Sequence, residues 1–367
     1  MRKTNQDNGI EKKRHLTANT TSDNHQEYSI RLKIGIFGHY GNQNLGDESI
    51  IKAAINNFTC LEPKISIRSY SLNPQDSQDR HKVPAFPIRY LAPKKADHNT
   101  SGNYPNESDL PKNQVNKNKV SLGNKLVGFL NNTPLLKKIV KIPIHIYTLS
   151  KEIIQEICFC CSSYKNAKDL HLLVVAGSNQ FLDNFGGPWG FPYTLFKWAI
   201  IAKLAGSKLA FASVGAGPLD SSLSKFFVKT ALFFSDYTSV RDHQSKMLLK
   251  SIGFKRKSTV FPDIAHSLTF KKTQMYPHAS LLPVVGINPM PVYDRRYWCH
   301  TDDSKYSDYI SKLAIFVELL LRKNHKVFLF NTMPKDLLVI EDIICILKKK
   351  SLPDNLLKSN LSVEKSH

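Results

Sequence analysis

The stretch LKIGIFGHYGNQNLGDESIIKAAINNF, residues 32–58, decides the fold. It begins with an apolar run, LKIGIF, and ends with IIKAAINNF, in which apolar residues recur at helical spacing. Between them lies GHYGNQNLGDES, residues 38–49, which contains three glycines and the adjacent acids Asp47 and Glu48. A strand that passes through a glycine-bearing turn into a helix is typical of an α/β protein with a parallel sheet. The glycine spacing matches neither a dinucleotide fingerprint nor a P-loop, so neither site is indicated.

The alternation of strand and helix patterns continues to about residue 268. Further strands are predicted at residues 65–72, 170–177, 207–217, 236–242 and 258–268. Helices are predicted at about 48–58, 138–166, 194–206, 222–235 and 243–253, and Pro143 interrupts the apolar spacing of the second. The run LHLLVVAG, residues 170–177, is apolar throughout, as expected of a parallel strand that is buried on both faces.

The composition of the chain divides it into several regions. Residues 1–31 are predicted to form a disordered polar leader, and 32–270 a Rossmann-like domain with an exposed insertion at about 92–124. Residues 271–283 read as a linker to a second unit, 284–367, with strands at 284–290 and 325–332 and helices at about 304–323 and 335–350. Since such sheets usually have about five strands, and the tail LPDNLLKSNLSVEKSH shows no strand pattern, we expect the second domain to be cut short.

The net charge is strongly positive, +21 from 51 basic and 30 acidic residues. Such a surface attracts anions, whether nucleic acid, a phosphorylated substrate or an anionic membrane face. No nucleic-acid-binding motif accompanies the charge, so nucleic acid is not expected as a partner. The first residues have no apolar signal-peptide core, and no run of about 18 apolar residues is present. We expect a cytoplasmic protein, with peripheral contact to the inner face of a membrane as a further expectation.

The six cysteines predict neither a metal site nor a disulfide framework. Three of them form the cluster CFCC (158–161), which has no paired CxxC motif and no histidine at ligand spacing. We interpret all six as buried thiols of a reducing compartment.

Candidate site residues follow the predicted strands, because ligands of α/β sheets bind beyond the carboxyl ends of the strands. Two carboxylates at a helix N-terminus repel phosphate and bind hydroxyl groups, so Asp47 and Glu48 are predicted to face a sugar or to act as a base. Asp47 is alternatively the cap of the following helix. The same turn supplies further candidates for substrate binding: Tyr40, Gly41, Asn44 and Gly46.

Later turns add a second group of candidates. Arg241 ends a strand and is predicted to bind a carboxylate or phosphate through its forked guanidinium group, although a surface pair with Asp242 is the alternative. Backbone N–H groups of the turn after residue 176 would suit an anion, while a plain strand-to-helix connection explains the GAGP turn equally well. The remaining substrate-binding candidates are Gly177, Asn179, Gly215, Gly217, Asp242, Ser245 and Asp263.

Five segments together resemble the polysaccharide pyruvyl transferase family: GHYGNQNLGDESI, LLVVAGSNQFLD, LAFASVGAGPL, YTSVRDHQSKMLLKSIGF and VFPDIAHSL. The resemblance covers about residues 32–268 and implies a fold similar to GT-B glycosyltransferases, with two Rossmann-like domains and a site in the cleft between them. It also implies transfer of pyruvate from phosphoenolpyruvate to two hydroxyls of a saccharide or a lipid-linked saccharide, as a cyclic ketal, in the synthesis of exopolysaccharide or another cell-surface glycan. Asp47 or Glu48 would then be the base or sugar anchor, and Arg241 the donor clamp. No cofactor beyond the donor is needed, and no metal is demanded.

Two departures from the family pattern keep other functions open. The usual glycine triplet reads Gly177-Ser178-Asn179, and nothing after residue 300 matches the Arg–x–His segment that family members carry late in the second domain. One alternative is therefore a sugar-binding remnant that is inactive because the late segment is missing. A GT-B glycosyltransferase that uses a nucleotide sugar is the other alternative.

Overall fold

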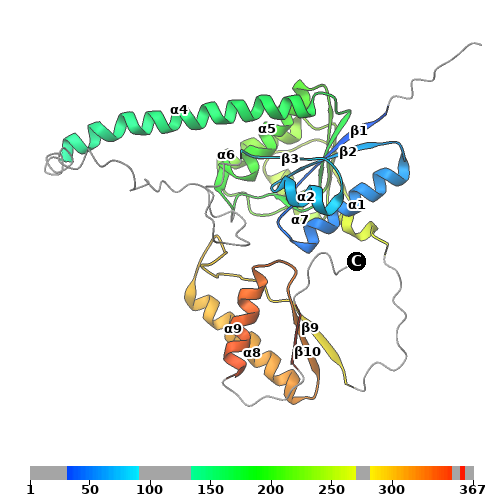
Figure 1. Cartoon of the computed structure of the whole chain (residues 1–367), viewed down its shortest axis with the longest axis vertical. Coiled ribbons are helices and arrows are strands. Elements are labelled where there is room, and N and C mark those ends of the chain that lie inside the picture. Colours follow the sequence, from blue (N-terminus) through cyan, green and yellow to red (C-terminus); the bar gives the residue numbers. More distant parts are fainter. Residues whose placement is uncertain (1–30, 91–133, 270–281, 349–355, 360–367) are drawn as a thin grey trace, which may run out of the picture. The chain divides into compact units, whose positions relative to one another are not determined.

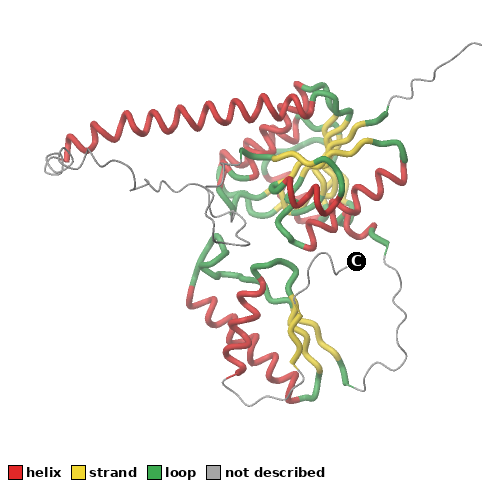
Figure 2. Tube along the Cα trace, viewed as in Figure 1, coloured by secondary structure: helices red, strands yellow, loops and turns green. Residues whose placement is uncertain are grey.

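The computed structural model describes residues 31–90, 134–269, 282–348 and 356–359. The predicted leader lies outside these ranges except for Arg31, as do the predicted insertion and nearly all of the predicted linker. The described residues form two parallel sheets with their helices (Figures 1 and 2). The predicted α/β class with parallel sheets is therefore confirmed.

The first sheet contains eight strands in the order β3-β2-β1-β4-β6-β7-β8, with β5 paired beside β6. All its pairings are parallel. Five strands lie within the predicted segments: β1 (Lys33–Phe37), β2 (Ser66–Ser71), β4 (Leu172–Ala176), β6 (Lys208–Ala216) and β7 (Tyr237–Val240). The predicted strand at 258–268 is reduced to β8 (Thr259–Val260), which a short 3-10 helix η2 (Ile264–Ser267) follows. The strands β3 (Ala85–Pro87) and β5 (Asn179–Phe181) were not predicted.

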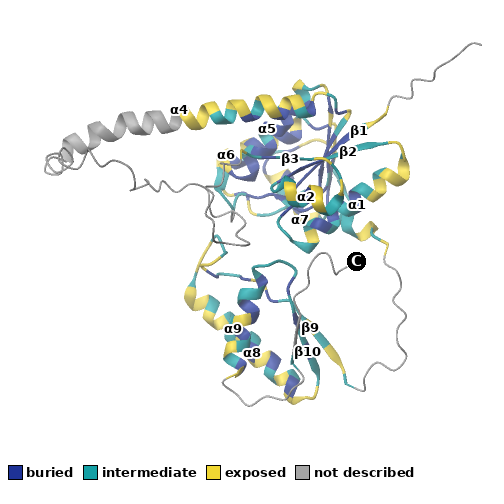
Figure 3. Cartoon of the chain, in the orientation of Figure 1, coloured by how far each residue is buried: buried dark blue, intermediate teal, exposed yellow. Residues whose placement is uncertain are grey.

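Helices cover both faces of this sheet because alternate residues of each strand point to opposite sides. On β4, Val174 and Ala176 pack with α1 (Leu45–Leu61), whereas Leu173 and Val175 belong to the core on the other face. That second face also buries residues of four helices, α4 (Pro134–Ala167), α5 (Phe191–Leu204), α6 (Ser222–Phe233) and α7 (His243–Ser251). Figure 3 shows the buried strands enclosed between these helices.

Two helices differ from the sequence prediction. Helix α4 continues through Pro143 and begins at Pro134, so the expected interruption does not occur. Helix α2 (Pro74–His81) was not predicted, because PQDSQDRH has no apolar stripe. It begins with Asn73, whose side chain accepts a hydrogen bond from the N–H of Asp76, and it positions two residues of the candidate site.

The second sheet has the order β11-β10-β9, from β9 (Val284–Ile287), β10 (Lys326–Phe330) and β11 (Leu356–Ser359). Helices α8 (Asp303–Arg322) and α9 (Asp336–Lys348) pack on it around Val327 and Leu329. The expectation that the tail contains no strand is wrong, since β11 pairs in parallel with β10 over Val327–Phe330. The second sheet therefore has three strands in the described residues, where two were predicted.

The expectation of buried thiols is also wrong. Four cysteines are exposed (Cys60, Cys158, Cys161 and Cys345), the other two are partly exposed, and all six are free. None of the helices in the described ranges combines the length and the apolar character needed to cross a bilayer.

Candidate functional site

The candidate residues that follow β1, β4, β6, β7 and β8 all lie at the carboxyl edge of the first sheet, because every strand of that sheet runs in the same direction. Between β1 and β7 stand β4 and β6. Three strand spacings of about 4.8 Å therefore separate the turn that carries Asp47 from the end of β7 at Arg241, roughly 14 Å.

Arg241 lies directly above the end of β6. A Cβ atom placed on Gly215 would be 2.7 Å from Nε and Cζ of Arg241 and 2.9 Å from Oδ1 of Asn179. Gly217 faces the other end of the same amide, with 3.0 Å from its Cβ position to Nδ2 of Asn179. Glycine is therefore needed at Gly215 to let the guanidinium and amide groups approach the strand and each other.

The guanidinium group of Arg241 is held loosely. Its Nε donates to Asp242 at 3.4 Å, its Nη1 lies 4.0 Å from Asp263, and its side chain is 36% exposed. Both contacts are long for charge-assisted hydrogen bonds. The predicted pair between Arg241 and Asp242 thus exists, but it leaves donor capacity on the guanidinium group, which carries five N–H bonds.

Asp242 and Ser245 position this part of the site. Asp242 caps α7, where its Oδ1 accepts the N–H of Ser245 at 2.6 Å. Burial would raise the pKa of Asp242, but the hydrogen bonds from Ser245 and Arg241 outweigh it and lower the pKa below its ordinary value. The buried hydroxyl of Ser245 accepts the N–H of Ala216 at 2.9 Å and so fixes the turn at the end of β6.

The N–H groups of three glycines at these turns are engaged within the sheet. The N–H of Gly177 donates to Ala212 at 2.8 Å, that of Gly215 to Ser178 at 2.7 Å, and that of Gly217 to Phe181 at 3.0 Å. These bonds belong to the pairing of β4 and β5 with β6, so none of the three donors is left for a ligand. The N–H of Gly177 is therefore not available to the anion that the turn after residue 176 was predicted to bind.

Among the side chains, Asn179 has spare capacity. Its Oδ1 is buried and accepts no hydrogen bond within the described part of the chain. Because a buried oxygen without a donor costs free energy, an arrangement of this kind is typical of a binding site.

Glu48 is not placed as the sequence predicted. Its side chain is 1% exposed, and its Oε1 accepts the N–H of Gly41 at 2.8 Å. Its Oε2 lies 2.7 Å from Nε2 of His81 and 3.8 Å from Nε of Arg80, both on α2. A carboxylate so enclosed fixes the turn after β1 and cannot face an acceptor sugar.

The other residues of this turn are mostly structural as well. Tyr40 is fully buried and donates its hydroxyl to the carbonyl of Ala176 at 2.9 Å, so it does not reach a substrate. Gly41 has a φ of +88°, and a Cβ there would be 2.4 Å from the carbonyl oxygen of Asn73. Gly177, with a φ of +51°, packs against Ile50.

Helix α1 begins earlier than predicted, and its cap is Asn44 rather than Asp47. The side chain of Asn44 accepts the N–H of Gly46 at 3.0 Å. Asp47 lies in the first turn of the helix, where the positive helix end favours a carboxylate, and it is half-buried. Of the two adjacent acids, Asp47 is the one that remains accessible.

Asp263 connects the two ends of this edge. It caps η2, which packs with Ala265 against the α1 side of the sheet, while its carboxylate lies beside Arg241. Burial, followed by the charges of Asp47, Glu48 and Asp263, raises the pKa of Tyr40 well above its usual range. The segment after β8 therefore returns across the edge toward the turn after β1.

Sequence reasoning missed His39 and the α2 residues that hold Glu48. Burial and then the positive charge of Arg89 lower the pKa of His39 well below its usual range, so the ring is neutral. The His39 ring packs against the ring of Phe191. Cζ of Arg89 lies 4.2 Å from the centroid of the same Phe191 ring. The position of His39 directly after β1 was the signal that could have singled it out.

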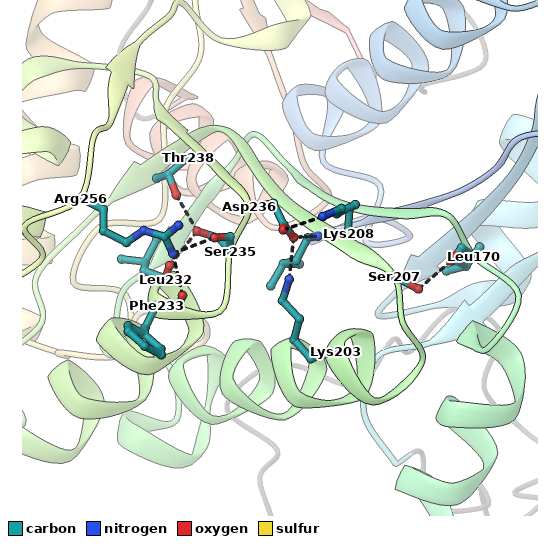
Figure 4. A network of polar contacts seen from close by, with 11 residues as sticks. Leu170, Lys203, Ser207, Lys208, Leu232, Phe233, Ser235, Asp236, Thr238 and Arg256 are labelled. Carbon is teal, nitrogen blue, oxygen red and sulfur yellow. Dashed lines mark hydrogen bonds and ion pairs between the residues drawn. The ribbon is translucent and has the colours of Figure 1, made fainter.

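The opposite, amino edge of the sheet has a hollow of about 290 Å³ lined by Ser235, Thr238, Arg256 and neighbouring residues. Its polar groups bind one another (Figure 4). Arg256 donates to the carbonyls of Phe233 and Ser235, and Asp236 accepts from Lys203 at 2.6 Å. These bonds satisfy polar groups at the C-terminal ends of α5 and α6, so we do not interpret the hollow as a second ligand-binding site. Within the described ranges, no cluster of acidic, histidine and cysteine side chains is suited to hold a metal ion.

A parallel sheet whose carboxyl edge gathers an arginine, an amide and two carboxylates places the protein in the α/β class, whose members bind ligands at this edge. Residues 44–365 match the model of the family described as polysaccharide pyruvyl transferase, and the chain belongs to this family. The family places it among the transferases that modify polysaccharides.

No curated protein matches the sequence. Among solved structures, the chain is similar to a glycosyltransferase from Rickettsia africae, with 10% identity, a TM-score of 0.40, and 90% of this chain and 68% of that one covered. It is also similar to a UDP-GlcNAc 2-epimerase from Methanocaldococcus jannaschii, with 11% identity, a TM-score of 0.39, and 90% and 73% covered. At these scores neither likeness supports an argument about activity.

Proposed function

We propose that the protein transfers pyruvate from phosphoenolpyruvate to two hydroxyl groups of a saccharide, which gives a cyclic ketal and inorganic phosphate. Family membership supports the reaction type, and the placement of Arg241 is the observation that carries the proposal. Its guanidinium group is partly exposed, loosely paired and seated above Gly215 beside the unsatisfied oxygen of Asn179.

The donor presents a carboxylate and a phosphate, and Arg241 is our candidate to bind one of them bidentately. In the reaction the methylene carbon of phosphoenolpyruvate takes up a proton, and one sugar oxygen bonds to C2. The second sugar oxygen bonds to the same carbon while the bond from C2 to the phosphate oxygen breaks. One hydroxyl proton thus offsets the proton taken up by carbon, and the other leaves with phosphate.

Asp47 and Asp263 are the candidates to orient or deprotonate the acceptor hydroxyls. Both carboxylates lie close enough to Tyr40 to influence its pKa, and both are partly accessible. Glu48 has no direct part in this scheme, because His81 and the N–H of Gly41 engage its carboxylate.

The test compares Arg241→Ala and Arg241→Lys with wild type by calorimetric titration with phosphoenolpyruvate and by phosphate release with hexose glycosides that carry free 4- and 6-hydroxyls. We expect Arg241→Ala to lower phosphate release by about 10²-fold or more, the typical effect of removing a donor that stabilises charge in the transition state. Arg241→Lys should keep only part of the wild-type phosphate release, since an ammonium group cannot bind a carboxylate or phosphate bidentately. Arg295→Ala, at a guanidinium group that is 71% exposed, is the matched control.

Equal donor affinity and phosphate release in wild type and Arg241→Ala would refute the role of Arg241. Release of nucleotide from a nucleotide sugar, without phosphate release from phosphoenolpyruvate, would replace the proposal with a glycosyl transfer.

A further inference from the structure

One side of the second half of α4 is apolar and exposed to solvent. We define the α4 stripe as six of its residues: Ile153, Ile154, Ile157, Cys158, Cys161 and Tyr164. Ile154 is 60% exposed, Ile157 56% and Ile153 51%, and all three are large apolar side chains. At 100° per residue, the six positions fall within one sector of about 140° around the helix axis. A contiguous apolar strip of this kind is unusual on a monomer surface and marks a contact site.

The stripe has a fixed orientation, because the other side of the same helix is anchored. Phe159, Ser163 and Ala167 are buried. Glu156 accepts hydrogen bonds from the hydroxyl of Tyr193 at 3.1 Å and from Nζ of Lys197 at 2.6 Å, both on α5. The burial and these bonds place α5 on one side of α4, and the exposed isoleucines of the stripe lie on another side of the helix. Figure 3 shows exposed residues along this half of α4.

The charges around the stripe are mainly positive. Lys151, Lys165 and Lys168 are exposed beside it, with Glu152 the nearby exposed acid. In the sequence, residues 134–149 of the same helix contain three lysines and no acid. Exposed lysines that flank an apolar strip characterise helices that lie in the interface of an anionic bilayer.

We propose that α4 docks the protein on the surface of an anionic membrane, with the α4 stripe inserted between the lipid headgroups. A second copy of the chain is the less suitable occupant, since two chains that each carry a net charge of +21 repel. Anionic headgroups instead attract lysines near the surface. Docking of this kind needs no membrane-spanning helix, and it does not depend on the reaction proposed above.

The test is co-sedimentation of the full chain with vesicles of phosphatidylcholine alone and of phosphatidylcholine mixed with phosphatidylglycerol. We expect binding only to the mixed vesicles, with a fall of at least tenfold in affinity between 50 and 500 mM salt. Ile154→Asp should lower the affinity for the mixed vesicles at least tenfold. Ile315→Asp, at an isoleucine of α8 that is 61% exposed, is the matched control and should bind as wild type does.

The native cysteines provide a measurement on the unmodified protein. Cys158 and Cys161 lie in the stripe, whereas Cys60 on α1 is exposed elsewhere. Mixed vesicles should slow the labelling of Cys158 and Cys161 by a polar maleimide at least fivefold and leave Cys60 unchanged, as read by peptide mass spectrometry.

Equal labelling of the stripe cysteines with and without vesicles would overturn the proposal, as would equal binding by folded Ile154→Asp and wild type. A stripe that is protected without lipid, in a chain that sediments as a dimer and becomes a monomer on Ile154→Asp, would identify a second copy as the occupant and also refute it. Phosphate release with soluble glycosides tests the reaction separately, so failure of one does not imply failure of the other.

Discussion

The adjacent acids Asp47 and Glu48 allow a decisive comparison, because the structure gives them opposite roles. Replacing Glu48 by alanine removes the acceptor of the Gly41 N–H at 2.8 Å and the partner of His81 at 2.7 Å. The side chain is 1% exposed, so water does not replace these contacts at once. Removing one partner of a buried pair costs about 3 to 5 kcal/mol of unfolding free energy, a large share of the 5 to 15 kcal/mol of a typical protein.

Glu48→Gln should cost less, about 1 to 2 kcal/mol, because an amide still accepts from Gly41 and can keep a hydrogen bond with His81. Asp47→Asn, in the half-exposed first turn, should change the unfolding free energy by less than about 1 kcal/mol. The measurement is urea unfolding followed by tryptophan fluorescence, in which the buried Trp198 reports on the first sheet. If Glu48→Ala unfolded within 1 kcal/mol of wild type yet released no phosphate, Glu48 would be a catalytic acid and the assignment made here would be refuted.

Two further predictions concern packing and pH. Gly215→Ala should lower phosphate release by about 10- to 100-fold with little loss of stability, because the added Cβ atom, 2.7 Å from Arg241 and 2.9 Å from Oδ1 of Asn179, moves these two side chains rather than backbone. In an Arg241→Ala background the same change should cost less, because only the contact with Asn179 remains, and an equal loss there would contradict the reasoning. Hydrogen bonds from Arg68 and then Lys33 lower the pKa of Asp169, so its stabilising effect is complete above its ordinary pKa of about 4 and is lost as the pH falls below it. The difference in unfolding free energy between wild type and Asp169→Asn should therefore be present at pH 7 and shrink steadily below pH 4. A difference independent of pH would show that the charge of the Asp169 carboxylate does not stabilise the fold.

The sequence was sufficient to predict most of the first sheet, because strands buried on both faces appear as continuous apolar runs such as LLVVA in β4. The three-residue strands β3 and β5 carry no such signal, and the polar sequence around β11 hides a strand that only its pairing with β10 reveals. Helix α2 was missed for a similar reason, since PQDSQDRH is polar on every side and its helical form depends on its cap and its neighbours.

The candidate site was predictable in place but not in the role of each residue. Parallel strands bring Arg241, Asn179 and the turn after β1 to one edge, and the order of motifs along the chain is enough to infer this. The environment of Glu48 was not predictable, because its partner His81 lies 33 residues later on a helix without a sequence signature. Likewise, the sequence left open whether the GAGP turn is a plain connection or a ligand cradle, and only the pairing of β5 with β6 shows that the N–H groups of Gly215 and Gly217 are engaged.

Most residues of the turn GHYGNQNLGDES for which the structure gives contacts have a packing role. Tyr40 fills the space under the turn and bonds to β4, Gly41 lets the chain pass Asn73, and Glu48 ties the turn to α2. Asp47 is then presented from a turn that is tied to β4 and to α2, and such a rigid support suits the role proposed for Asp47. At the other end of the edge, Ser245 and Asp242 hold the support of Arg241 in a comparable way. If Asp47 acts as proposed, substitutions at these supporting residues should lower phosphate release as effectively as replacement of Asp47 itself, because they would misplace its carboxylate.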